Sequence, residues 1–125
     1  IIDKYKTVYG FSLFVIINPD KSVMDKRFAF RQDESSIYDG EWADYTAYTV
    51  RGAYDKSTDE DCEIIVVNKI WNSDNDVNTF AHESFHAAVD ILEACHIKLS
   101  DDTNEVFAYL IGYFTECVNK TANKR

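Results

Sequence analysis

The sequence is poor in cysteine and in the residues that interrupt regular structure. Among its 125 residues there are four glycines, one proline and three cysteines. Scarce glycine and proline predict that most of the chain lies in regular elements joined by short connections. The cysteines are odd in number and none forms a CxxC pair, which argues against a disulfide scaffold and against a cysteine-ligated zinc site. This usage favours a reducing compartment, and therefore a cytoplasmic location over others, but the sequence leaves localisation open.

Positive charge and long apolar runs are also scarce. Thirteen basic residues face 22 acidic ones, for a net charge of −9, and the basic residues are scattered. Such a chain repels phosphate backbones and anionic membrane surfaces, so we expect no nucleic-acid partner. The longest uncharged stretch, Thr7–Pro19, has 13 residues, fewer than the roughly 20 that span a bilayer. We therefore expect no membrane span. The chain begins Ile1-Ile2 rather than with Met, so we expect a trimmed or processed product.

The length and the apolar content predict one folded domain, residues 1–125. Apolar residues make up 46% of the chain, enough for one hydrophobic core. The first half has strand patterns, and a short helix is an option within residues 1–8. Strands are predicted within about 11–67, at Phe11–Ile17, Arg27–Arg31, Tyr45–Arg51 and Cys62–Val67. The sequence does not predict an oligomeric state.

The second half has the 3.6-residue period of two amphipathic helices, at about 78–95 and about 103–119. Strands followed by helices predict an α+β fold. We expect a mostly antiparallel sheet of about four strands, followed by two antiparallel helices that pack on one face.

The first predicted helix carries the sequence His82-Glu83-Ser84-Phe85-His86, an H-E-x-x-H motif. At 100° per residue, the two histidines lie about 40° apart and one turn apart, so both imidazoles can approach one ion. Glu83 lies on the adjoining side, where a carboxylate can hold a metal-bound water and take its proton. The motif therefore predicts a zinc site with His82 and His86 as ligands. The alternative is a solvated helix face with two surface histidines.

A catalytic zinc needs a third protein ligand and one open position. Asp90 and Glu93 lie too far along the helix axis, and His96 lies at or beyond the helix end. Glu105, in the first turn of the second helix, is the favoured third ligand if the chain folds back antiparallel. Its alternative role is in a capping box with Asp102.

These residues carry a resemblance to a known class. His82-Glu83-x-x-His86 followed by Asn104-Glu105-x-x-Ala108-Tyr109 resembles the gluzincin pattern of zinc metallopeptidases. Over about residues 79–114 the chain is similar to small zincin-like proteins of phages and mobile elements. The resemblance implies one Zn²⁺ per chain in a His-His-Glu site. It also implies a peptide or protein substrate, laid antiparallel along an edge strand.

The expected activity is zinc-dependent hydrolysis of a peptide bond by a metal-activated water, with Glu83 as general base. Tyr109 and Tyr113 are candidate donors to the oxyanion, as are Tyr45, Tyr48 and Tyr54 from the sheet. Two other functions stay open. One is a zincin-fold binding module with structural zinc or lost activity. The other is a metal-free acidic interaction protein.

Overall fold

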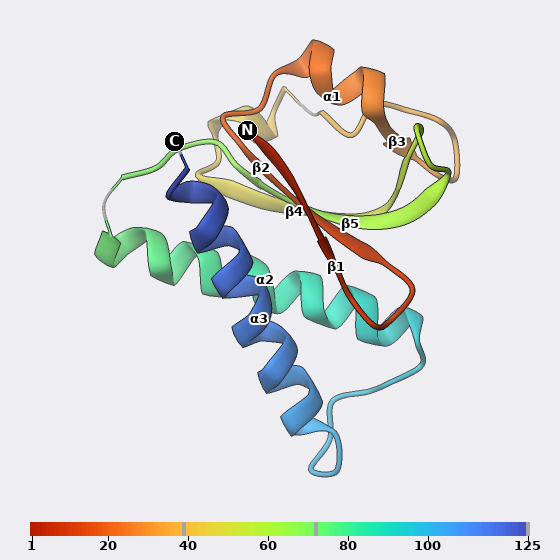
Figure 1. Cartoon of the computed structure of the whole chain (residues 1–125), viewed down its shortest axis with the longest axis vertical. Helices are drawn as coiled ribbons and strands as arrows, with labels where there is room; N and C mark the ends of the chain where they lie inside the picture. The colour runs from red at the N-terminus through yellow and green to blue at the C-terminus, as the bar shows by residue number, and fades with distance from the viewer. Residues whose placement is uncertain (39, 72, 125) are drawn as a thin grey trace.

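The computed structural model describes residues 1–38, 40–71 and 73–124. In these residues, five strands form one sheet in the order β1-β2-β5-β4-β3, and two long helices cover one of its faces (Figure 1). The strands are β1 (Ile2–Lys6), β2 (Ser12–Ile17), β3 (Phe28–Phe30), β4 (Ala47–Asp55) and β5 (Glu60–Val67). The helices are α1 (Lys21–Arg27), α2 (Ser73–Ala94) and α3 (Asn104–Ala122), with a short 3-10 turn, η1, at Trp42–Asp44.

The two central strands, β2 and β5, are buried on both faces. Side chains alternate along a strand, so each strand contributes to two separate cores. Leu13, Val15 and Ile65 face α2 and α3, whereas Phe14 and Ile64 face the opposite side with Met24 of α1. This explains why β2 and the second half of β5, Ile64–Val67, appear in the sequence as apolar runs rather than as an alternation.

The predicted α+β fold is confirmed, with a mostly antiparallel sheet. The exception is the central pair, because β2 and β5 run parallel, with Ser12 beside Cys62 and Ile17 beside Val67. The long helices follow the strands as expected, and α3 crosses α2 obliquely on the same side of the sheet (Figure 1). They are longer than predicted, since α2 begins at Ser73 and α3 ends at Ala122.

Two short elements at the start of the chain differ from the prediction. The optional helix within residues 1–8 is wrong, because Ile2–Lys6 forms β1 and pairs antiparallel with β2. This segment alternates partly buried and exposed positions, as an edge strand does. Helix α1 was missed, although Asp20 signals its start by accepting the Val23 N–H at 3.1 Å.

Among the helices of the described residues, none is long and apolar enough to cross a membrane.

Candidate functional site

The H-E-x-x-H motif lies in the middle of α2, on the side that faces β4. Both histidine rings are exposed, and their Nε2 atoms lie 3.2 Å apart. Two nitrogens at that separation can both lie about 2.1 Å from one zinc ion, with an N–Zn–N angle of about 100°. The pair therefore fits two ligand positions of a tetrahedral site.

Glu83 lies on the adjoining side of α2 and is only 8% exposed. The Thr49 hydroxyl of β4 donates to Glu83 Oε2 at 2.6 Å. The same hydroxyl lies 3.1 Å from the Glu83 carbonyl oxygen. A threonine hydroxyl has one proton, so the shorter contact to the carboxylate takes it. Thr49 thus holds the carboxylate against the sheet and leaves Oε1 free of that bond.

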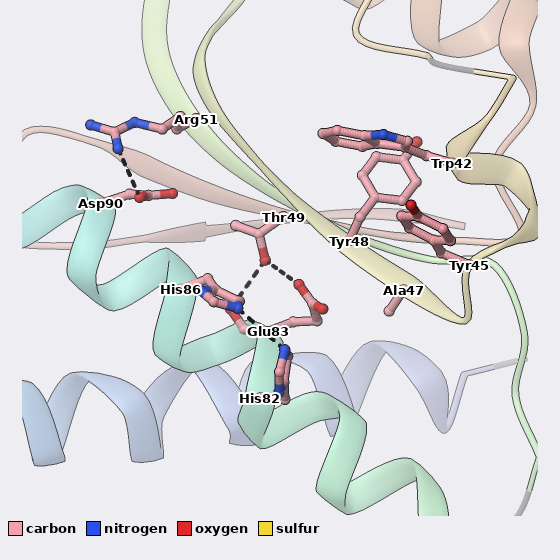
Figure 2. A pocket seen from close by; sticks show the side chains of 10 residues that line it. All are labelled: Trp42, Tyr45, Ala47, Tyr48, Thr49, Arg51, His82, Glu83, His86 and Asp90. Carbon is pink, nitrogen blue, oxygen red and sulfur yellow. Dashed lines mark hydrogen bonds and ion pairs between the residues drawn. The ribbon is translucent and has the colours of Figure 1, made fainter.

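These residues line a cleft of about 470 Å³ between α2 and β4. Figure 2 shows its two ends, with the imidazoles and Glu83 between them. One end holds the aromatic side chains of Trp42, Tyr45 and Tyr48, and the other holds Arg51 and Asp90. Trp42 and Tyr48 contact each other edge to face, with ring centroids 5.0 Å apart. The cleft is therefore apolar at one end and charged at the other.

The edge of β4 that borders this cleft is open. On the side away from β5, β3 covers β4 only from Ala53 to Asp55. The Asn68 N–H donates to the Thr46 carbonyl at 2.8 Å, which places the hydrogen-bonded positions of the β4–β5 ladder at Thr46 and every second residue after it. Ala47 and Thr49 therefore direct their N–H and C=O groups away from β5. Within the described ranges, no backbone group pairs with them on that side.

A buried carboxyl lies next to the charged end of the cleft, in a neighbouring pocket that shares Arg51 and Asp90. Arg51 Nη1 lies 3.5 Å from Asp90 Oδ1, and Glu63 of β5, 3% exposed, lies beside Asp90. Burial, reinforced by the adjacent Asp90, raises the pKa of Glu63 to about 11, although Arg51 opposes the shift. Glu63 is therefore a neutral carboxylic acid at pH 7.

Glu105 lies away from the two histidines. It lines a different pocket with Tyr9, Tyr109 and Tyr113. The cause is the helical period, because Glu105 lies about 200° around α3 from Phe107. Phe107 is buried in the core against α2, so Glu105 faces the other way. In the described part of the chain, no group of three or more His, Cys, Asp or Glu residues is placed to hold a metal. The structure thus brings together two of the three predicted ligands.

The capping alternative for Glu105 is wrong as well. Thr103 is the N-cap residue of α3, and no side-chain cap hydrogen bond forms there. Glu105 is then the second residue of the helix, whereas a capping box needs a glutamate at the third. Its charge in the first turn still complements the helix dipole.

The tyrosines predicted as oxyanion donors lie in different parts of the structure, and two of them line the histidine cleft. Tyr109 and Tyr113, the first candidates for an oxyanion donor, lie beside Glu105 and not at the histidines. The Tyr113 hydroxyl donates to the Lys6 carbonyl at 3.1 Å. Tyr54 donates to Glu34. Tyr45, 56% exposed, and Tyr48 are the tyrosines that line the histidine cleft.

Sequence reasoning missed Thr49, Arg51 and Trp42 as residues of this cleft. The predicted strand at Tyr45–Arg51 contained a usable signal, because its alternation places Thr49 on one face and Tyr48 and Val50 on the other. Nothing in the sequence indicated that this strand would lie beside the H-E-x-x-H helix. That proximity comes from the packing of α2 against β4 and β5 in the folded chain.

Comparison with known proteins gives no match, whether with family models, curated proteins or solved structures.

Proposed function

We propose that the chain is a zincin-like metal-dependent peptide hydrolase, with its site on α2 beside the open edge of β4. The proposal rests chiefly on the convergence of the His82 and His86 Nε2 atoms, 3.2 Å apart, next to a carboxylate held by Thr49. Two histidines on a solvated helix face would require neither converging Nε2 atoms nor a neighbouring carboxylate held in place.

His82 and His86 would hold one Zn²⁺ through neutral imidazoles. The ion would supply Lewis-acid chemistry, polarising a water and the scissile carbonyl. Glu83 would accept a proton on Oε1, since Thr49 occupies Oε2, and would return it to the leaving amine. Glu105 is left out of this proposed site, because it lies on the side of α3 that faces away from α2 and lines a different pocket from the two histidines.

The open edge of β4 supports a peptide as the substrate. The free N–H and C=O groups of Ala47 and Thr49 can pair with an extended peptide backbone, which adds a strand to the sheet. Backbone pairing of this kind binds peptides of many sequences, so it supports a peptide or protein substrate without specifying one. Tyr45 is the tyrosine best placed to donate to an oxyanion, because it is exposed at the same cleft.

The proposal is tested first by zinc content and then by hydrolysis. Protein purified without a metal-affinity tag should contain about one zinc per chain by elemental analysis. His86→Ala should lose it, whereas His96→Ala, which removes the histidine outside the cleft, should keep it. Zinc-loaded protein should cleave a mixture of unstructured peptides, and Glu83→Gln should retain zinc without cleaving. Full cleavage by Glu83→Gln would contradict the mechanism.

The position of Glu105 favours a second candidate, a zinc-binding module without hydrolytic activity. With two protein ligands rather than three, the metal site lacks the ligand count of the usual catalytic zinc. In that case zinc binds and is lost in His86→Ala, but neither the parent protein nor Glu83→Gln cleaves peptides. A chain that takes up no zinc at all would favour the metal-free acidic interaction protein.

A further inference from the structure

A second pocket, on the face of α3 that points away from α2, combines aromatic rings with a single carboxylate. It measures about 410 Å³ and lies between the β1–β2 turn and the first half of α3. Three tyrosines, Tyr9, Tyr109 and Tyr113, line it together with Glu105, over a floor of Val106 and Leu110. Tyr109 is 76% exposed and Tyr113 40% exposed, so two of the rings are open to a visiting group.

The rings are carried by braced parts of the structure. Glu105, Tyr109 and Tyr113 follow one another at four-residue intervals along one face of α3. Tyr113 is fixed by its bond to the Lys6 carbonyl. The turn that carries Tyr9 is closed by Thr7, whose hydroxyl donates to the Phe11 carbonyl at 2.6 Å and accepts the Tyr9 N–H at 3.2 Å. The pocket is therefore largely formed before any ligand arrives.

The charge of this pocket selects a cation. Among the described residues, Glu105 is the only charged one that lines it, and no ion pair engages it there. Tyrosine faces attract alkylammonium groups through the ring quadrupole, and an apolar floor suits the methylene stem that carries such a group. A net charge of −9 also draws basic partners toward the protein.

We propose that this pocket binds the side chain of a lysine exposed on a partner protein. The methylene stem packs on Val106 and Leu110, and the ammonium lies against the tyrosine rings and pairs with Glu105. This site is separate from the histidine cleft and does not depend on zinc or on hydrolysis.

The test is an NMR titration of the full chain at low salt with two probes, Nα-acetyl-lysine amide and its neutral counterpart Nα-acetyl-norleucine amide. We expect the lysine probe to give saturable shifts at Tyr9, Tyr109 and Tyr113 with a roughly millimolar Kd. The norleucine probe should not saturate these sites, because it lacks the ammonium group.

Two variants test the carboxylate and the aromatic ring of the pocket separately. Glu105→Gln and Tyr109→Leu should each weaken the lysine probe by about two- to five-fold. Glu93→Gln and Tyr45→Leu, which change an exposed glutamate and an exposed tyrosine elsewhere, should leave binding unchanged. All four positions are exposed, so the variants should keep the fold. Equal binding of both probes, or no saturation by lysine, would overturn the proposal.

Discussion

Replacing Glu63 by glutamine should stabilise the protein at neutral pH and flatten the dependence of its stability on pH. Glu63 is 3% exposed, and its Oε2 has no hydrogen-bond partner among the described residues. Its pKa is about 11 in the folded state, against an ordinary value of 4.5. Between these two values the folded chain holds a proton that the unfolded chain has released. The contribution of Glu63 to stability is therefore greatest below pH 4.5 and falls as pH rises toward 11.

The size of the effect follows from the pKa difference. Each pH unit in that window lowers the free energy of unfolding by about 1.4 kcal/mol. From pH 5 to pH 7 the loss is then at most about 3 kcal/mol, and water entering around Glu63 would reduce it. Glutamine keeps the shape, carries no titrating proton and can donate its amide N–H to Asp90. We expect Glu63→Gln to be more stable than the parent protein at pH 7 by up to about 3 kcal/mol.

Urea unfolding followed by circular dichroism at pH 5, 6, 7 and 8, with a chelator present, measures this effect. Contributions from the other titrating groups cancel when the two proteins are compared. Glu93→Gln removes an exposed glutamate on α2 and serves as the matched control, with the slope of the parent. Parallel pH profiles for the parent and Glu63→Gln would refute the assignment of a neutral buried carboxyl.

Two further predictions concern Thr49 and the cysteines. Thr49→Val removes the hydroxyl that holds Glu83 and should lower the free energy of unfolding by about 1–2 kcal/mol, whereas Thr49→Ser should recover most of that loss. If the protein hydrolyses peptides, kcat should fall in the valine variant and return in the serine variant. Equal stability of all three proteins would count against the hydrogen bond. Burial raises the pKa of Cys62 to about 12, and Cys117 is buried as well. A thiol reagent at pH 8 should therefore label Cys95 alone in the native protein and all three cysteines in denaturant, as mass spectrometry would show, and rapid native labelling of Cys62 would disprove its burial.

The main elements of the fold could be predicted because their patterns are strong over many residues. Strand β2 is almost entirely apolar and β5 ends in the apolar run Ile64–Val67, while α2 and α3 repeat apolar residues at helical spacing across four or more turns. β1 and α1 are only five and seven residues long. At that length no period is resolved, and β1 is specified instead by its pairing with β2. Tertiary pairing of this kind leaves little trace in the local sequence.

The site was predictable only where it lies within one element. The spacing of His82, Glu83 and His86 along a helix sets their relative positions, and the structure brings all three to one cleft. The position of Glu105 depended on how α3 faces α2. The buried positions Phe107, Leu110 and Phe114 already required one face of α3 to meet the core, and Glu105 lies outside that face. The prediction of Glu105 as a ligand rests on the coordination needs of zinc and not on this burial pattern.

The sheet gives the three residues of the motif different environments. Helix α2 lies with one side against β4, so the side that carries Glu83 is covered while both imidazoles stay exposed. A buried carboxylate without a donor would be costly, and Thr49 supplies the donor from the strand. Where β3 ends, no backbone group in the described part of the chain pairs with the outward groups of Ala47 and Thr49 on this strand. One residue, Thr49, therefore braces Glu83 with its side chain and offers its backbone to an incoming strand. An extended peptide bound there would lie directly beside the carboxylate and the paired imidazoles, as the proposed hydrolysis requires.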